Sequence, residues 1–146
     1  MKPRGPVDIL LVEDNPDHAR FILRALTEDT GVQTFLVKDG DAALEFLRRF
    51  AEERDTVSAR PLVVLLDIHL PRINGHDVLR QIRLDEALQA IPVVMLTTSD
   101  RKEEIAAAYR AGANGYVTKP LKLGEFVEKL TSLVRYWTFT SEIPAA

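Results

Sequence analysis

The sequence predicts one α/β domain in which a five-stranded parallel sheet is covered by helices on both faces, the doubly wound arrangement. Two observations lead to this prediction: short apolar runs rich in Val, Ile and Leu, and longer amphipathic segments between them. The two kinds of segment alternate five times along the chain. Strands separated by helices pair in parallel through right-handed crossovers. A length of 146 residues suits a single domain.

Five segments are predicted to be strands. Three of them are nearly uniform in apolar residues, which is typical of strands that are buried on both faces. A more mixed run suits a strand at the sheet edge, and the last run is short. In chain order the strands are residues 7–12 (broken by Asp8), the mixed run 33–37, and then 62–66, 93–96 and 116–117.

Between the predicted strands, apolar residues recur with the spacing of one helix face. The segment after the fifth strand is the clearest case, because its stripe is continuous over three turns. The stripes are Ala19, Ile22, Ala25 and Leu26; Leu44, Leu47, Phe50 and Ala51; Val78, Leu79 and Ile82 within 75–84; Ile105, Ala108 and Tyr109 within 101–111; and Phe126, Leu130, Leu133, Val134 and Trp137.

Signals for helix ends lie where these segments begin and stop. Asn15 before Pro16 is a typical cap followed by a first-turn proline, and Asp100 with Glu103 has the spacing of a capping box. Gly112 follows the fourth helical segment, where glycine commonly ends a helix. We therefore predict five helices, each of which starts shortly after a strand.

Composition and charge exclude several classes of protein. The net charge is -3 without long runs of one sign, so we expect no binding to nucleic acid and no attraction to a membrane surface. Cysteine is absent, which excludes disulfides and thiol catalysis. The chain shows no signal-peptide core and no apolar stretch of the ~18 to 20 residues that a span needs. We expect a cytoplasmic protein with a tail at 1–6, one domain at 7–136 and an extension at 137–146.

Acidic, hydroxyl and lysine side chains follow the predicted strands. The carboxyl ends of parallel strands meet at one edge of a sheet, where binding sites form, so we expect these side chains to converge. An acidic residue after a strand is by itself most often the start of a solvated loop, and only the whole set indicates a site. The set is Glu13 and Asp14 after the first strand, Asp67 after the third, Thr97 and Thr98 after the fourth, and Lys119 and Pro120 after the fifth.

Three carboxylates in one place repel each other and need protons or a cation. Oxygen ligands without cysteine favour a hard cation, and Mg²⁺ held by carboxylates and waters is the natural candidate. A carboxylate such as Asp67 can also attack phosphorus and form an aspartyl phosphate. Phosphoryl transfer requires charge neutralisation, which Lys119 would supply as an ammonium and Thr97 as a hydroxyl donor.

Four stretches of the sequence, in order, join the apolar runs to these polar residues. They are Leu10-Leu11-Val12-Glu13-Asp14-Asn15; Leu65-Leu66-Asp67-Ile68-His69-Leu70-Pro71 with Asn74-Gly75; Val94-Met95-Leu96-Thr97-Thr98; and Gly115-Tyr116-Val117-Thr118-Lys119-Pro120. Together they resemble the motif set of response regulator receiver domains, the CheY-like family, over about residues 7–136. The resemblance implies a sheet with the strand order 2-1-3-4-5. It also implies a phosphoacceptor rather than an enzyme, with at most Mg²⁺-dependent self-phosphorylation and autodephosphorylation.

The resemblance implies a metal site around the phosphoacceptor. Asp67 would receive the phosphoryl group, while Asp14, Asp67 and the backbone carbonyl of His69 would hold Mg²⁺ and Glu13 would reach it through a water. His69 departs from the Asn or Met that is commoner at this position. Since a carbonyl ligand does not depend on the side chain, we expect His69 to change the phosphoryl lifetime and not the metal binding. Its imidazole is expected at the surface.

The resemblance also implies a switch. The hydroxyl of Thr97 and the ring of Tyr116 would rearrange on phosphorylation, and the Lys119 ammonium would contact the phosphoryl group. The bond between Lys119 and Pro120 is usually cis in this family, which proline makes accessible. The expected output is a changed contact with another protein.

The whole pattern implies a single-domain response regulator that takes a phosphoryl group from a sensor histidine kinase. The C-terminal extension and the Phe46-Leu47 end of the second helix resemble the regulators that pair with cyanobacterial and bacterial phytochromes. A bacteriophytochrome is therefore the candidate kinase, and a histidine phosphotransfer protein is a candidate for onward transfer. Trp137 and Phe139 either cap the core or protrude toward a partner; we favour protrusion and a homodimer.

Two other functions stay open at this stage. The chain could be an interaction module that keeps the fold without phosphorylation, although such modules usually lack one of the acidic or lysine residues that are present here. It could also be a flavodoxin-like cofactor binder or a small phosphatase of related topology. The acidic loop at 13–16 argues against the latter, because it would repel a bound phosphate.

Overall fold

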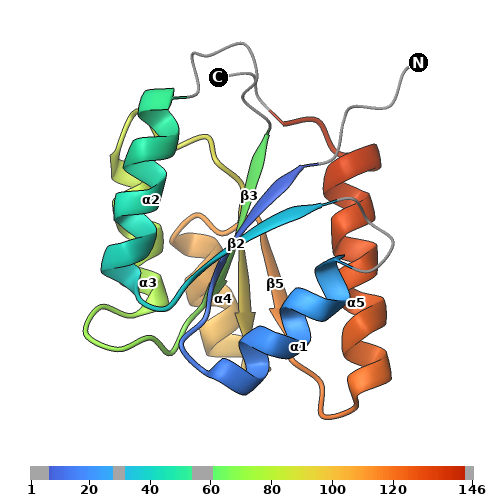
Figure 1. The fold of residues 1–146 in the computed structure, drawn as a ribbon. Coiled ribbons are helices and arrows are strands. Elements are labelled where there is room, and N and C mark those ends of the chain that lie inside the picture. The colour runs from blue at the N-terminus through green and yellow to red at the C-terminus, as the bar shows by residue number, and fades with distance from the viewer. Residues whose placement is uncertain (1–6, 28–31, 54–60, 144–146) are drawn as a thin grey trace.

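The computed structural model describes residues 7–27, 32–53 and 61–143 (Figure 1). The predicted tail at 1–6 lies outside these ranges. Within them, every helix is too short or too polar to span a bilayer. In chain order the elements are β1 (Asp8–Val12), α1 (Pro16–Thr27), β2 (Gln33–Val37), α2 (Gly40–Glu53), β3 (Leu62–Asp67), α3 (Gly75–Leu84), β4 (Val93–Thr97), α4 (Lys102–Arg110), β5 (Gly115–Thr118), α5 (Leu123–Arg135) and a π-helical turn, η1 (Tyr136–Thr140).

The five strands form one parallel sheet in the order β2-β1-β3-β4-β5. This is the predicted order, and the mixed run β2 lies at an edge. The helices α1 and α5 cover one face of the sheet, while α2, α3 and α4 cover the other (Figure 1). The predicted doubly wound α/β fold is therefore confirmed.

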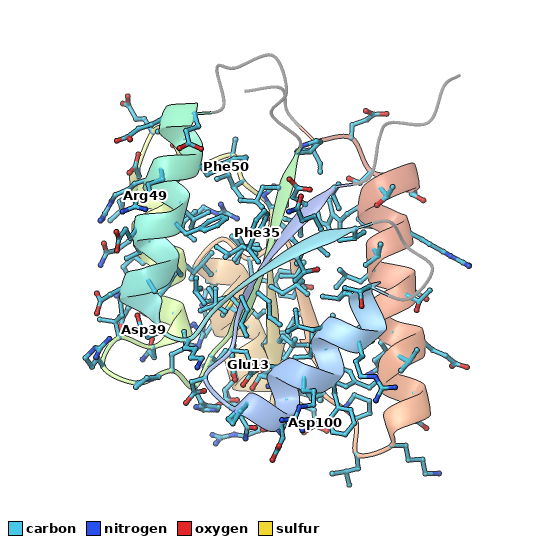
Figure 2. All side chains as sticks on the ribbon, in the orientation of Figure 1. Glu13, Phe35, Asp39, Arg49, Phe50 and Asp100 are labelled. Atoms are coloured by element: carbon cyan, nitrogen blue, oxygen red, sulfur yellow. The ribbon has the colours of Figure 1, made fainter. Side chains whose placement is uncertain are left out.

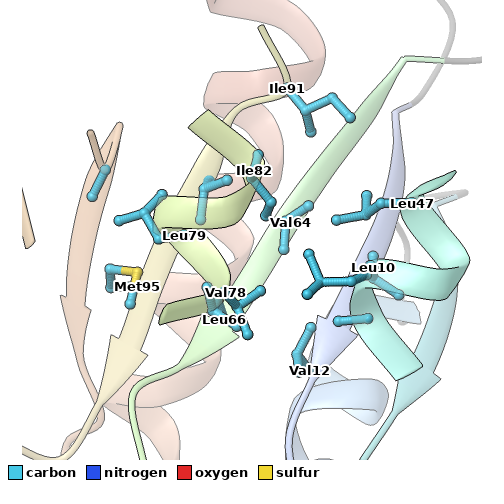
Figure 3. Packing of buried hydrophobic residues seen from close by; sticks show 14 of the residues in the cluster. Leu10, Val12, Leu47, Val64, Leu66, Val78, Leu79, Ile82, Ile91 and Met95 are labelled. Atoms are coloured by element: carbon cyan, nitrogen blue, oxygen red, sulfur yellow. The ribbon is translucent and has the colours of Figure 1, made fainter. Parts of the chain in front are cut away.

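Alternate residues of the strands fill two separate apolar cores. Leu10 and Val12 of β1 belong to the core under α2, α3 and α4, which Figure 3 shows around Leu79. Ile9 and Leu11 belong to the core under α1 and α5. These four side chains of β1 are 0% exposed. Full burial of one such side chain contributes about 1.5–3 kcal/mol, so β1 stabilises both layers of the fold.

Side-chain caps fix the starts of α1 and α3, and the cap at Asn15 was predicted. The side chain of Asn15 accepts hydrogen bonds from the amides of Asp17 and His18, at 2.9 and 3.1 Å, at the start of α1. Asn74 and Asp77 form a capping box at the start of α3. These caps give partners to amides that have none inside the helix. They also fix the loops through which the chain leaves β1 and β3.

The start of α4 differs from the prediction. The cap of this helix is Arg101, whose side chain makes no capping hydrogen bond, so the predicted capping box of Asp100 and Glu103 is wrong. The helix begins one residue later than that box requires. Tyr109 was expected to face the core but is 50% exposed, because the small Ala108 makes the buried contact.

The last described segment packs on the core under α1 and α5. Trp137, in η1, is only 8% exposed, and Ile143 packs against the same core. The apolar stripe of α5 thus continues past Arg135, and the expectation that Trp137 protrudes is wrong. Tyr136, next to it, is 50% exposed. The side chain of Phe139 lies outside the described part of the chain.

Arg83, near the end of α3, joins the loops that lead into β4 and β5. Its guanidinium donates to the carbonyl oxygens of Gly112, Gln89 and Ile91 and to the side chain of Asn114, over distances of 2.7–3.1 Å. Gly112 has φ +105°, and a Cβ at this position would lie 2.9 Å from Nε of Arg83. Glycine therefore lets this loop approach the guanidinium of Arg83. The guanidinium in turn holds the loops at the end of the sheet opposite the carboxyl ends of the strands.

We expect Arg83→Met to lower the free energy of unfolding by about 2–4 kcal/mol, because several carbonyl oxygens lose a charged donor. Arg80→Met, on the exposed side of the same helix, should change it by less than about 0.5 kcal/mol. Urea unfolding of both variants measures the difference. Equal stabilities would show that Arg83 does not hold these loops.

Candidate functional site

The polar residues predicted to converge meet at the carboxyl end of the sheet. Glu13 follows β1, Asp67 ends the central strand β3, and Lys119 follows β5. Figure 2 shows Glu13 at this end, close to the start of α1. Lys119 starts two strands away from Asp67 and reaches it through its long side chain. A pocket of about 220 Å³ at this end is lined by Glu13, Asp14, Asn15, His18, Asp67, His69, Thr98 and Lys119.

The ammonium of Lys119 is the centre of the buried part of the pocket. Its Nζ donates to Glu13 Oε2 at 2.6 Å and to Asp67 Oδ2 at 3.3 Å, and it lies 3.1 Å from Nδ1 of His18. The side chain is 6% exposed. The Lys119 amide donates to the carbonyl oxygen of Thr97 at 2.6 Å, which fixes the chain where it leaves β5. Lys119, which follows β5, therefore contacts residues at the ends of β1, β3 and β4.

The carboxyl group of Glu13 is buried beside the ammonium of Lys119 and the carboxylate of Asp67. Burial raises its pKa from 4.5 to about 7; the hydrogen bond from Lys119 opposes this increase, and the charge of Asp67 adds to it. Without a cation, Glu13 is thus only about half ionised near neutral pH. A positive ion in the pocket would favour the ionised form.

The carboxylates are spaced for a cation. One oxygen from each of Glu13, Asp14 and Asp67 lies within 4.8 Å of the others. Asp14 is exposed, whereas Glu13 and Asp67 are buried, so the cluster opens to solvent on the Asp14 side. Oxygen ligands around one hard ion are separated by distances of this order. The cluster therefore fits a divalent metal ion.

The loop after β3 orients the carboxylate of Asp67. The amide of His69 donates to Asp67 Oδ1 at 3.1 Å, so each carboxylate oxygen has a donor, with Lys119 on the other. The amide of Gly75 donates to the carbonyl oxygen of Ile68 at 2.8 Å, and a Cβ at Gly75 would overlap the carbonyl oxygen of Asp67. Glycine therefore allows α3 to start against the site. The side chain of His69 is exposed, as expected.

Thr97 and Tyr116 both contact Ser99, in the loop between β4 and α4. Thr97 is fully buried, and its Oγ1 accepts a hydrogen bond from the Ser99 amide at 3.3 Å. The hydroxyl of Tyr116 donates to the Ser99 carbonyl oxygen at 3.0 Å. Of the two adjacent threonines, Thr98 is the one that lines the pocket. The predicted switch pair is thus joined through one residue at the rim of the site.

The expected cis bond between Lys119 and Pro120 is not found, since no described peptide bond is cis. The trans isomer of a bond to proline is favoured by about 0.5–1 kcal/mol. Lys119 contacts both Glu13 and Asp67 with the bond in this form.

His18 is the pocket residue that the sequence analysis missed. It is the third residue of α1 and stands four positions after Asp14. Side chains of a helix lean toward its N-terminus, and this helix starts directly after the acidic pair. The signal that could have identified His18 is therefore its place in the first turn of a helix that follows a strand-end carboxylate.

Comparison with known proteins gives concordant results. The model of the response regulator receiver domain matches residues 9–131. The response regulator Rcp1 of Synechocystis sp. is 35% identical over 142 residues, which are 97% of this chain and 95% of that protein. A probable methanogenesis regulatory protein of Methanothrix harundinacea, FilR2, is 40% identical over 139 residues, 94% of this chain and 87% of the relative.

Solved structures with the same fold include phytochrome response regulators. The phosphorylated cyanobacterial phytochrome response regulator RcpA superposes with a TM-score of 0.83 at 33% identity, over 96% of this chain and 99% of that one. The Mn²⁺-bound form of Rcp1 superposes with a TM-score of 0.81 at 34% identity, over 96% of this chain and 100% of that one. The chain therefore belongs to the response regulator receiver family, the phosphoacceptor domains of two-component signalling, and is similar to its phytochrome-associated members.

Proposed function

We propose that this chain is a single-domain response regulator that accepts a phosphoryl group on Asp67 from a sensor histidine kinase. The observation that carries the proposal is the position of Asp67, which shares the Lys119 ammonium with Glu13 and belongs to the carboxylate cluster. Mg²⁺ held by Asp14, Asp67 and the carbonyl of His69, with Glu13 through a water, would neutralise the phosphoryl oxygens.

The transfer makes one bond and breaks one. An oxygen of the Asp67 carboxylate forms a bond to phosphorus while the bond from phosphorus to the imidazole nitrogen of the donor breaks. The imidazole leaves with the electron pair and takes up a proton from solvent. Because Asp67 attacks as a carboxylate, this chain needs no general base. Lys119 neutralises charge on the phosphoryl oxygens, which together with positioning is the main requirement of such reactions.

The output would begin at Thr97. A phosphoryl group on Asp67 adds acceptor oxygens at the end of β3, next to β4. If the Thr97 hydroxyl turns toward them, it loses its contact with the Ser99 amide, and the loop that holds the Tyr116 hydroxyl is released. A ligand-driven switch of this kind needs only a few kcal/mol of differential interaction. The change would alter the surface formed by α4, β5 and α5.

The proposed partners follow from the family and from its similar members. A phytochrome-type histidine kinase is the proposed donor, because regulators named for phytochromes are similar over nearly the whole chain. A histidine phosphotransfer protein is the proposed acceptor for onward relay. Because the chain has a net charge of -3, we propose that it binds other proteins and not nucleic acid or a membrane surface. We propose that these contacts are made in the cytoplasm.

Phosphorylation can be tested without the kinase. Incubation with Mg²⁺ and acetyl phosphate should raise the mass of the intact chain by one phosphoryl group, and Asp67→Asn should abolish the gain, because an amide is a poor nucleophile. Asp17→Asn, which alters an exposed carboxylate of α1, should behave as the native chain. A gain that survives in Asp67→Asn would contradict the assignment. A native chain that stays unmodified would favour the phosphorylation-independent interaction module.

We expect the affinity for Mg²⁺ to increase about tenfold between pH 6 and pH 8. The pKa of Glu13 in the folded chain is about 7, so over this range the carboxylate goes from largely protonated to largely ionised. Calorimetric titration at the two pH values measures the change. In Glu13→Gln the affinity should be lower and nearly independent of pH; an equal pH dependence in this variant would assign it to another group.

The raised pKa of Glu13 also predicts how the stability of the folded chain depends on pH when Mg²⁺ is absent. Since burial raises the pKa of Glu13, its contribution to stability is complete below about pH 4.5 and is lost as the pH rises through about 7. Urea unfolding at pH 5 and pH 8, with Glu13→Gln as the reference, isolates this contribution. Added Mg²⁺ should restore stability at pH 8.

We further propose that the chain forms a homodimer through the face of α4, β5 and α5. A groove of about 820 Å³ on this face is lined by residues that include Tyr109, Tyr116, Leu133, Tyr136 and Trp137. Tyr109 and Tyr136 are each 50% exposed. Aromatic side chains are typical anchors of protein interfaces, and large exposed apolar patches are uncommon on monomers.

Tyr136→Glu should convert the dimer to a monomer in sedimentation, because it places a charge at the edge of the groove. This variant is preferable to truncation after Arg135, which would also remove the buried Trp137 from the core. Leu84→Glu, at a position that is 78% exposed on α3, serves as the control and should remain dimeric. A native monomer, or a dimer that persists in Tyr136→Glu, would contradict the proposed interface.

A further inference from the structure

Among the described residues, three polar groups lie around the Lys119 ammonium, and one of them has no role in the proposed phosphorylation. Two partners are the carboxylates of Glu13 and Asp67. The third is the ring of His18, whose Nδ1 lies 3.1 Å from Nζ of Lys119 and 3.9 Å from Oε1 of Glu13. The resemblance to receiver domains assigns nothing to His18. Its role must therefore be inferred from the contact itself.

Hydrogen-bond chemistry fixes the direction of this contact. An ammonium has three donors and no acceptor, so Nδ1 of His18 accepts and the ring proton lies on Nε2. With Glu13 Oε2, Asp67 Oδ2 and His18 Nδ1 around Nζ, each donor of Lys119 has a partner. His18 offers a ring nitrogen, whereas the other two partners are carboxylate oxygens. It therefore restrains the ammonium without adding a further carboxylate to the pocket that the phosphoryl group enters.

The loop that carries Glu13 also places His18. The amide of Asn15 donates to Glu13 Oε1 at 3.2 Å, and the side chain of Asn15 accepts from the His18 amide at 3.1 Å. These two hydrogen bonds, which do not involve Lys119, fix Glu13 and His18 relative to each other. The side chain of His18 is 41% exposed. It lies at the rim of the pocket, where a substitution removes little packing.

We propose that His18 is a positioning residue that directs the Lys119 ammonium toward the phosphoryl group, a role that rests on the proposed phosphorylation of Asp67. As the phosphoryl group bonds to Asp67, its oxygens take over the donor that now points at Oδ2. Glu13 and His18 keep the other two donors and so fix the direction of the third. Without His18, the ammonium can turn about its contact with Glu13, and fewer of its orientations meet the phosphoryl group.

The test compares His18→Leu, which removes the acceptor, with His18→Asn, whose Oδ1 stands near the place of Nδ1. In the full chain with saturating Mg²⁺, phosphorylation from acetyl phosphate is followed by intact mass; acetate leaves as the phosphoryl group moves to Asp67. We expect His18→Leu to lower the maximal rate about three- to tenfold. The acetyl phosphate concentration for half-maximal rate and the Mg²⁺ affinity should not change.

His18→Asn should recover most of the rate. The matched control is His76→Leu, which changes a half-buried histidine in the first turn of α3.

Two further measurements show whether His18 acts through Lys119. In the background of Lys119→Met, His18→Leu should have no additional effect on the rate, because the group that it positions is gone. In ¹⁵N-lysine NMR spectra, the ammonium signal that Lys119→Arg removes should exchange faster with water in His18→Leu than in the native chain.

The possible results separate this inference from the proposed function. A native chain that gains no phosphoryl group overturns both. Native phosphorylation with an unchanged rate in His18→Leu overturns the role of His18 alone, as does a rate in His18→Asn as low as in His18→Leu. Equal losses in the native and Lys119→Met backgrounds would also overturn it, because His18 would then act independently of Lys119.

Discussion

The ion pair between Lys119 and Glu13 is the interaction on which the site depends. It joins the ends of β1 and β5 across 106 residues of sequence, and both side chains are almost fully buried. Two charges taken out of water are maintained only when other groups complete their hydrogen bonds. Asp67 and His18 do so for Lys119, and the Asn15 amide does so for Glu13. Because the pocket holds three carboxylates and one ammonium, it carries two excess negative charges when all four groups are ionised. A divalent cation cancels that excess, so the pair that builds the pocket also sets the charge of the ion that it can take.

The fold brings these groups together with little contribution from long loops. Asp67 ends the central strand, so the ends of β1 and β4 are its direct neighbours, and only Lys119 has to reach over a longer distance. Gly75 lets α3 start against the backbone of Asp67, and Arg83 holds the loops at the opposite edge of the sheet. The site therefore lies at the carboxyl end of the sheet, while Arg83 holds the loops that lead into β4 and β5 at the opposite end.

The residues that end strands could be predicted from the sequence, because an apolar run shows where a strand stops and a parallel sheet aligns those ends. Positions that depend on the exact start or direction of a helix could not. Asp100 failed as a cap because α4 starts one residue later, and His18 was missed because its contact depends on the direction of α1. Trp137 continues the stripe of α5, so its spacing indicated burial more reliably than its aromatic character indicated an interface.

Ser99 shows how short the distance is between the site and the proposed output surface. Its amide donates to Thr97, at the end of β4, and its carbonyl oxygen accepts from Tyr116, which lines the groove beside α5. A change in the Thr97 hydroxyl would therefore act on Tyr116 through a single peptide segment, without a chain of packed residues across the core. Coupling needs an element with two arrangements that both sites bias, and the loop at Ser99 contacts both Thr97 and Tyr116. The rigid part of the domain can then stay unchanged while the surface between α4 and α5 changes.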